Sequence, residues 1–234
     1  NLAGRCVLVT AGPTYEDLDP VRYLGNRSSG RMGFAVAAEA MDSGARVVLI
    51  AGPTALEPPV GAEVVHVRTA EEMFAAVMAK IDEADAVVMA SAVSDYTPRE
   101  GRSDQKMLKG DGDLALTLRR TPDILAELGR RRDSQARPLL VGFAAETNDM
   151  LARARAKLTA KRLDLIVAND VSRADTGFGT DTNAATIVAR DPAQADQVVP
   201  LGTKQALARV IVSRVAGLLS TSVDTPTSDR VETG

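Results

Sequence analysis

Residues 6–13 read CVLVTAGP, a short apolar run that ends at a glycine and a proline. A strand of a parallel sheet that is buried on both faces has this continuous apolar pattern, whereas a half-buried strand alternates. Small and apolar side chains follow at helical spacing over residues 31–43, and Gly44 is a typical helix C-cap. This order predicts a buried strand followed by a helix, the repeating unit of α/β proteins.

The same alternation continues along the chain. We expect further strands at 47–51, 63–67, 86–90, 114–118, 139–143 and 165–168, and a hairpin of 184–189 with 197–200. We expect further helices at 69–83, from 121 onwards with Pro122 in the first turn, at 148–161 and at 202–219. Polar loops are expected at 14–30, 96–113 and 170–183. The predicted fold is therefore α/β: a Rossmann-like open, mostly parallel sheet with helices on both faces, plus a small β-hairpin.

The composition is that of a folded globular domain. Of the 234 residues, 45% are hydrophobic and 25% are charged, which excludes a chain that is disordered throughout. Aromatic residues make up only 3% and the net charge is -3, so no nucleic-acid surface is expected. The single cysteine, Cys6, and the single histidine, His66, exclude a disulfide framework and metal sites built on several such ligands.

No segment is expected to enter a membrane, because no apolar run approaches ~18 residues. No secretory signal peptide is visible, so we expect a cytoplasmic protein. The chain starts with Asn1 rather than Met, which suggests a fragment of a longer protein. We expect one domain over 1–220 and a disordered tail over 221–234, which is rich in Ser, Thr, Asp, Pro and Gly.

Polar residues follow the first predicted strand, and ligands of open parallel sheets bind at the carboxyl ends of strands. Residues 28–30, Ser-Ser-Gly, stand directly before a helix, where small side chains let an anion reach free backbone N–H groups. Arg22, Arg27 and Arg31 could add charge-assisted hydrogen bonds. An ordinary N-cap made by one of the two serines explains the same residues equally well. The segment lacks the lysine of a P-loop and a complete G-x-G-x-x-G pattern.

Other predicted strand ends also carry polar groups. Asp95 could hold a metal–phosphate complex or contact a base, or it could be an ordinary turn residue. Lys106 and Lys109 lie in the next loop and could close over phosphates, although a solvated charge run fits as well. Asn169 follows a later strand and could contact a ligand or form a turn.

An aromatic residue and two lysines complete the set of candidates. Phe143 could stack on a base or belong to the core. Lys157 and Lys161 are four residues apart on one helix face, where they repel each other unless an anion lies between them or water surrounds them. Together, these positions favour an enzyme that uses a nucleotide.

The chain resembles the phosphopantothenoylcysteine synthetase domains of bacterial bifunctional coenzyme A biosynthesis proteins. The resemblance runs from about Val7 to Leu219. It is carried by VTAGPT at 9–14, DPVRY at 19–23, NRSSGRMG at 26–33, VSDY at 93–96, GFAAET at 142–147, ANDV at 168–171 and GF at 177–178. It implies a CTP-dependent ligase that joins 4'-phosphopantothenate to L-cysteine through an acyl-cytidylate, with release of pyrophosphate and CMP.

The resemblance also implies cofactors and partners. Mg²⁺ would accompany CTP, with ligands that the sequence does not assign, and this domain would hold no flavin. The protein would be a homodimer whose hairpin region, 178–189, contributes to dimerisation. A flavin-dependent decarboxylase domain would precede it in the full-length chain. The partners would then be small molecules and a second copy, with no nucleic acid and no membrane.

The resemblance assigns roles residue by residue. The catalytic residues would be Asn26 and Lys106. The nucleotide would bind to Met89, Ala90, Ser91, Asp95, Lys106, Arg119, Arg120, Thr121, Pro122, Phe143, Lys157 and Lys161. The substrate would bind to Arg22, Asn26, Ser28, Ser29 and Gly30. The chain departs from the family pattern at 106–109, where it reads KMLK instead of Lys-x-Lys-Lys, and at Thr121, where Asn is common.

Two other readings remain open. An NAD(P)- or flavin-dependent oxidoreductase shares the fold class, but its glycine pattern is incomplete here and no acidic residue ends the second strand, at Ala51-Gly52-Pro53. A non-catalytic nucleotide-binding or scaffold domain is the other reading, and CTP binding without turnover would favour it.

Overall fold

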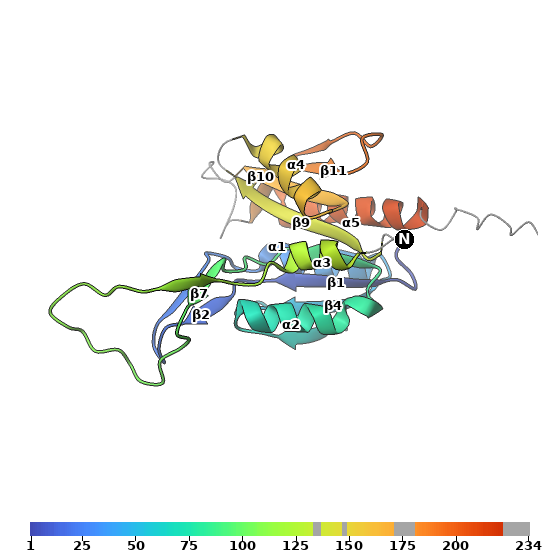
Figure 1. The fold of residues 1–234 in the computed structure, drawn as a ribbon. Coiled ribbons are helices and arrows are strands. Elements are labelled where there is room, and N and C mark those ends of the chain that lie inside the picture. The colour runs from blue at the N-terminus through green and yellow to red at the C-terminus, as the bar shows by residue number, and fades with distance from the viewer. Residues whose placement is uncertain (133–136, 147–148, 171–180, 222–234) are drawn as a thin grey trace, which may run out of the picture.

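The computed structural model describes residues 1–132, 137–146, 149–170 and 181–221. Its centre is an eight-stranded sheet with the order β12-β11-β10-β9-β6-β1-β4-β5 (Figure 1). The strands are β1 (Cys6–Ala11), β4 (Arg46–Ala51), β5 (Glu63–His66), β6 (Ala86–Met89), β9 (Leu139–Glu146), β10 (Leu165–Asp170), β11 (Thr182–Ala189) and β12 (Gln197–Thr203). Six of them are parallel, and β11 and β12 join antiparallel at one edge. The predicted fold class is confirmed, and the predicted hairpin is the edge of the main sheet.

The first strand shows why its sequence is apolar without interruption. All six residues of β1 are buried, and they alternate between two cores. Val7 and Val9 belong to the core on one face, and Cys6 and Leu8 belong to the core on the other face. A central strand between two covered faces needs apolar side chains on both sides.

Five helices of the described ranges cover the two faces of the main sheet. Residues of α1 (Arg31–Asp42) and α5 (Lys204–Thr221) complete the first core. Residues of α2 (Ala70–Lys80), α3 (Ile124–Arg131) and α4 (Met150–Ala160) complete the second core. The prediction of helices on both faces is therefore confirmed. None of the helices in the four described ranges is long and apolar enough to cross a lipid bilayer.

Two small sheets form outside the main sheet, and three of their four strands lie where the sequence predicts loops. β2 (Tyr15–Asp17) pairs with β3 (Tyr23–Gly25), and β7 (Tyr96–Pro98) pairs with β8 (Leu118–Arg120). The predicted strand at 114–118 is wrong except for its last residue. Its leucines alternate as in a strand, but they are exposed and no core covers them, so the pattern lacks the tertiary partner that a strand needs.

Two helix boundaries differ from the prediction for a local reason, and the others shift by one or two residues. α3 begins after Asp123, whose carboxylate accepts the N–H of Ala126 at 3.0 Å, so Pro122 precedes the helix instead of lying in its first turn. α2 ends at Lys80 and passes into the single 3₁₀ turn η1 (Ile81–Glu83). Thr221 still belongs to α5, and the rest of the predicted tail, 222–234, lies outside the described residues.

A long segment leaves the body of the molecule between β7 and β8. Figure 1 shows residues 99–117 as a green trace that projects away from the main sheet beside β2. Leu108 and Leu114 on this segment are exposed. We call residues 99–117 the projecting segment.

Candidate functional site

The candidate site lies at the carboxyl ends of the parallel strands, as the fold class predicts. The loop after β6 is tied to the loop after β1 by side chains. The hydroxyls of Thr10 and Ser91 are 2.8 Å apart, and the N–H of Ser94 donates to Thr14 Oγ1 at 2.9 Å. These bonds hold residues 91–95 between two cavities.

The first cavity has a volume of about 430 Å³ and opens between the loop after β6 and helices α3 and α4. Nine of the predicted nucleotide-binding residues line it: Met89, Ser91, Asp95, Arg120, Thr121, Pro122, Phe143, Lys157 and Lys161. They come from four separate parts of the sequence, so the structure brings this predicted group together.

Hydrogen bonds fix the walls of the first cavity. Thr121 Oγ1 donates to the carbonyl of Ser94 at 2.6 Å, and its N–H donates to the carbonyl of Asp95 at 3.0 Å. Lys157 Nζ donates to the carbonyl of Phe143 at 2.8 Å. Thr121, which replaces an expected Asn, therefore anchors the loop that carries Asp95.

Lys161 forms an ion pair with Asp123, with Nζ 2.7 Å from Oδ2. Burial acts to raise the pKa of Asp123, but the hydrogen bonds from Lys161 and from the Ala126 N–H outweigh it, so this pKa lies below its usual value. Lys157 and Lys161 both line the cavity and both have protein partners, so a purely solvated pair is not what the structure shows.

The second cavity also has a volume of about 430 Å³ and lies at the start of α1. Four of the predicted substrate-binding residues line it: Asn26, Ser28, Ser29 and Gly30. It shares Ser91, Val93, Asp95, Phe143 and Lys157 with the first cavity, and the predicted nucleotide-binding residue Ala90 lines it as well. The two cavities are therefore neighbours with one common wall.

Asn26 is held against this common wall. Its side-chain amide donates to the carbonyl of Val93 at 2.9 Å and to that of Ala92 at 3.4 Å. The sequence places Asn26 far from Val93, and the structure brings the predicted catalytic asparagine to the loop that carries Asp95.

The N-terminus of α1 opens onto the second cavity. The N-cap is Gly30, with a φ of 80°, and no side chain caps the helix. The alternative that Ser28 or Ser29 is an ordinary N-cap is therefore wrong, although Ser28 Oγ accepts the N–H of Gly30 at 3.3 Å. Backbone N–H groups at such a helix end can bind an anion.

Three lining residues of the second cavity come from the last strands and α5. Lys204 is only 6% exposed and Asn183 is buried. Burial lowers the pKa of Lys204, with Asp181 acting in the opposite direction and Arg31 in the same direction. Asn169 also lines the cavity, and its Oδ1 is buried without a hydrogen-bond partner among the described residues. Sequence reasoning misses Lys204 and Asn183, because only the antiparallel return of β11 beside β10 brings them here.

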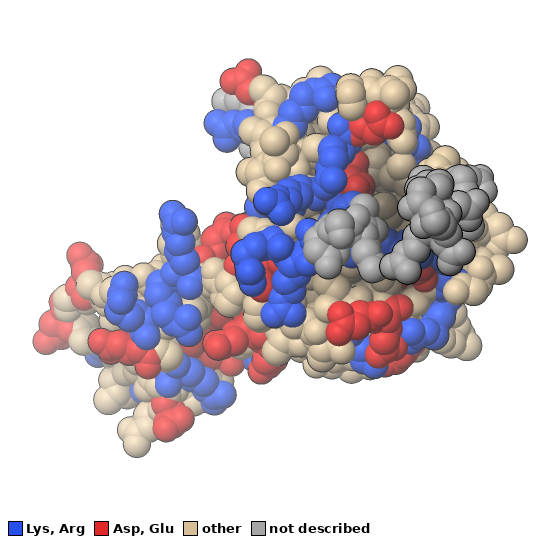
Figure 2. All heavy atoms as spheres, turned by 45° about the vertical axis from the view of Figure 1, so that its right-hand side comes forward, with Lys and Arg blue, Asp and Glu red and all other residues tan. Residues whose placement is uncertain are grey.

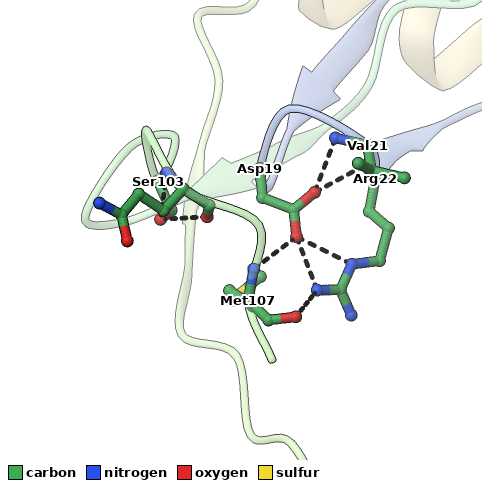
Figure 3. Close-up of polar contacts among 6 residues, drawn as sticks. Asp19, Val21, Arg22, Ser103 and Met107 are labelled. Atoms are coloured by element: carbon green, nitrogen blue, oxygen red, sulfur yellow. Dashed lines mark hydrogen bonds and ion pairs between the residues drawn. The ribbon is translucent and has the colours of Figure 1, made fainter. Parts of the chain in front are cut away.

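Four candidate residues lie elsewhere. Lys106 and Lys109 are exposed on the projecting segment, and they do not belong to the lining of either cavity. Arg119 lines a neighbouring groove, with its guanidinium 3.6 Å from Glu71. Arg22 lies on the turn between β2 and β3, where it pairs with Asp19 at 2.6 Å (Figure 3).

The surface charge is mixed. Figure 2 shows Lys and Arg side chains gathered in the middle of one face, with Asp and Glu side chains close by. Several basic residues of α3 and α4 have carboxylate partners: Arg130 and Arg131 pair with Glu127, and Arg155 pairs with Asp196.

Comparison with known proteins identifies a family and several similar proteins. The model of the family described as DNA/pantothenate metabolism flavoprotein C-terminal domain matches residues 2–219. The coenzyme A biosynthesis bifunctional protein CoaBC of Bacillus subtilis is 47% identical over 93% of this chain and 52% of its own length. The protein of the same name from Escherichia coli is 42% identical over 89% of this chain and 51% of its own length. The chain thus spans about half the length of these curated relatives.

Among solved structures, the C-terminal domain of a coenzyme A biosynthesis bifunctional protein CoaBC superposes with a TM-score of 0.79. It is 37% identical in sequence, and the match covers 94% of this chain and 98% of that chain. The match therefore includes the main sheet and the strand ends that form both cavities.

Proposed function

The chain belongs to the family of DNA/pantothenate metabolism flavoprotein C-terminal domains, and on this basis we propose that it is a phosphopantothenate–cysteine ligase of coenzyme A biosynthesis. The observation that carries the proposal is the common wall of the two cavities. Phe143, Lys157 and Asp95 face both of them, with Asn26 bound to the same wall. A ligase needs such neighbouring sites because it must bring a nucleotide and an acid into contact.

The proposed reaction has two steps. The carboxylate of 4'-phosphopantothenate attacks the α-phosphate of CTP, which forms an acyl-cytidylate and releases pyrophosphate. The amine of L-cysteine then attacks the acyl carbon, which forms the amide and releases CMP. A free carboxylate is a poor acyl donor, so the first step supplies the leaving group that the second step needs.

The first cavity suits the nucleotide. Lys157, Lys161 and Arg120 place positive charge around it, which would stabilise the triphosphate as charge moves to the leaving group. Phe143 offers an aromatic surface at the shared wall. We propose that CTP binds here, with its α-phosphate toward Asp95 and the second cavity.

The second cavity suits the acid. The uncapped N-terminus of α1 provides backbone N–H groups for an anion, and the ammonium of Lys204 lies in the same lining. Asn26 is uncharged, so its amide can hydrogen-bond the reacting carbonyl without repelling the incoming carboxylate.

We propose that Mg²⁺ accompanies the nucleotide and neutralises phosphate charge when it is bound. Within the described residues, no group of three or more His, Cys, Asp or Glu side chains could form a complete metal cage. This donor set fits Mg²⁺ held mainly by phosphate oxygens and water, with Asp95 as the carboxylate nearest to both cavities.

We also propose that the active form is a homodimer. The small β2–β3 and β7–β8 sheets and the projecting segment expose large apolar side chains: Val21, Tyr23, Tyr96, Leu108, Leu114 and Leu116. Exposed apolar side chains on these elements could be covered by a second copy of the chain. Sedimentation equilibrium should give twice the chain mass of 24.6 kDa, and a single chain mass over the assay range of concentrations would contradict the dimer.

We propose in addition that a flavin-dependent decarboxylase domain precedes this one in the full-length protein, because the curated relatives are called bifunctional and are about twice as long. The full-length protein should show flavin absorbance after purification, and the present chain should not.

The ligase proposal is tested by product analysis. The chain is incubated with CTP, Mg²⁺, 4'-phosphopantothenate and L-cysteine, and the amide product is measured by mass spectrometry, with ATP replacing CTP in a parallel reaction. Amide and CMP in equal amounts support the proposal. Folded protein that forms no amide with either nucleotide contradicts it and favours a domain that binds nucleotide without turnover.

A further inference from the structure

The carboxylate of Asp19 joins two parts of the chain that lie far apart in the sequence. Asp19 is 1% exposed. Its Oδ1 accepts the backbone N–H groups of Val21 and Arg22, both at 2.8 Å. Its Oδ2 accepts Nε and Nη2 of Arg22 at 2.9 and 2.6 Å, and also the backbone N–H of Met107 at 3.1 Å (Figure 3).

The two oxygens of this carboxylate have different tasks. The bonds to Oδ1 close a local turn, as Asp side chains commonly do. The bonds to Oδ2 reach the guanidinium of Arg22 and the backbone of the projecting segment. Arg22 completes the connection, because its Nη2 also donates to the carbonyl of Met107. Met107 is therefore held through both its N–H and its carbonyl.

The contacts of Asp19 and Arg22 with Met107 anchor the projecting segment directly beside Lys106. One further bond attaches the projecting segment to the same turn, from the N–H of Ser103 to the carbonyl of Leu18 at 2.9 Å. Immediately after the anchor, Leu108 is 91% exposed. Lys106 immediately precedes it, and neighbouring Cα atoms are only about 3.8 Å apart. Holding Met107 thus fixes the point from which the Lys106 side chain extends.

We propose that Asp19 is a positioning residue that acts through both Lys106 and Arg22. It orients the guanidinium of Arg22 directly, and it fixes Lys106 through the backbone of Met107. This inference rests on the proposed function and on the roles that the family resemblance assigns to Lys106, as a nucleotide-binding residue, and to Arg22, as a substrate-binding residue. It assigns to Asp19 the coupling of these two side chains.

The substitution Asp19→Asn should keep the local turn but break the contacts with the guanidinium of Arg22 and the N–H of Met107. The remaining oxygen can still accept the N–H groups of Val21 and Arg22, so the turn can form. The new NH₂ group would face the guanidinium of Arg22 and the N–H of Met107, which are donors and cannot bond to it. The matched control is Asp111→Asn, which makes the same chemical change at an exposed carboxylate of the projecting segment.

Limited trypsin digestion reports on the anchor without any assay of activity. The peptide bond between Lys106 and Met107 includes the N–H that Asp19 accepts, whereas the bond after Lys109 lies beyond the anchor. We expect Asp19→Asn to accelerate cleavage after Lys106 on the order of tenfold relative to cleavage after Lys109, because local opening exposes the bond. Asp111→Asn should leave this ratio unchanged. An unchanged ratio in Asp19→Asn would overturn the anchor.

A double-mutant cycle tests the functional coupling. Turnover is measured for the wild type, Asp19→Asn, Lys106→Ala and the double variant. If Asp19 acts through Lys106, Asp19→Asn lowers kcat roughly tenfold or more in the wild type and much less in the Lys106→Ala background. Equal factors in both backgrounds would overturn the proposed coupling, because Asp19 would then act independently of Lys106.

The proposed function and the folding of Asp19→Asn can each fail separately from the anchor. If Asp19→Asn shows the selective cleavage but the wild type makes no amide, the anchor stands, and the proposed function falls together with the catalytic part of this inference. If Asp19→Asn fails to fold, Met107→Pro removes the N–H that Asp19 accepts, and it also fixes φ at residue 107 and restricts the backbone of Lys106. That variant should lose turnover as Lys106→Ala does, and full turnover in folded Met107→Pro would overturn the proposal.

Discussion

The side-chain amide of Asn26 donates a hydrogen bond to the carbonyl of Val93 at 2.9 Å. This contact joins the segment before α1 to the loop after β6, which forms the wall between the two cavities. An asparagine can make this bond, and an aspartate of the same shape cannot, because an ionised carboxylate only accepts.

We therefore predict that Asn26→Asp lowers turnover on the order of 100-fold, because it places a negative charge where a carboxylate substrate must react. Asn26 is exposed, so the melting temperature should change little. The control is Asn1→Asp, since the oxygen that accepts the N–H of Ala3 is retained there. Wild-type turnover in Asn26→Asp would show that Asn26 takes no part in the reaction.

A second prediction concerns the positive charge of the first cavity. Lys161→Gln removes one ammonium from the lining, and we expect KM for CTP to rise roughly tenfold, since a charge-assisted hydrogen bond is worth about 1.5–3 kcal/mol. The matched control is Lys80→Gln, which removes a lysine paired with Glu63 and Glu83 outside both cavities. Equal KM values for both variants would mean that Lys161 serves only its ion pair with Asp123.

A third prediction concerns the contact of α1 with β1. A Cβ at Gly33 would lie 2.5 Å from the Cβ of Ala11, so Gly33→Ala must push the helix from the sheet. We expect a loss of about 1–3 kcal/mol in the free energy of unfolding. Gly217→Ala is the control in α5, where a Cβ meets nothing within 4 Å.

The control variant should change the free energy of unfolding in the opposite direction. Gly217→Ala should stabilise the protein by about 0.5–1 kcal/mol, because alanine loses less backbone entropy in a helix than glycine. Urea unfolding measures both variants. Equal effects of the two substitutions would refute the close contact between α1 and β1.

A fourth prediction concerns stability in acid. Burial acts to raise the pKa of Asp19, but the hydrogen bonds from Val21, Arg22 and Met107 outweigh it and hold this pKa well below its usual value. The folded state therefore binds this proton less readily than the unfolded state, whose Asp pKa is about 3.9. The stabilisation is complete above that pH and is lost as the pH falls toward the folded pKa.

The measurement is the free energy of unfolding of the wild type and of Asp19→Asn between about pH 6 and pH 2. The difference between them should shrink below about pH 4. Glu127 gives a surface comparison, because Arg130 and Arg131 lower its pKa to about 2. Salt at about 0.5 M should weaken the effect of Glu127→Gln more than that of Asp19→Asn. A difference that does not depend on pH would contradict the account of Asp19.

The sequence predicts most of the central sheet, because inner strands such as β1, β4 and β6 are buried on both faces and are therefore mainly apolar. Position at the strand ends was also enough to find Asp95 and Phe143, whereas Asn26 was identified through the family resemblance. The small β2–β3 and β7–β8 sheets could not be predicted, since each of their strands has three residues and no core face. Lys204 and Asn183 were missed because the order of strands in the sheet, which local patterns do not encode, brings them to the cavity.

The proposed two-step ligation is tested most directly by pyrophosphate release with and without L-cysteine. The chain is supplied with CTP, Mg²⁺ and 4'-phosphopantothenate, with ATP as the control nucleotide. We predict that release requires phosphopantothenate and prefers CTP. It should stop near one pyrophosphate per site without cysteine and continue when cysteine is added. Continuous release without phosphopantothenate, or none from folded protein under any combination, would contradict the ligation.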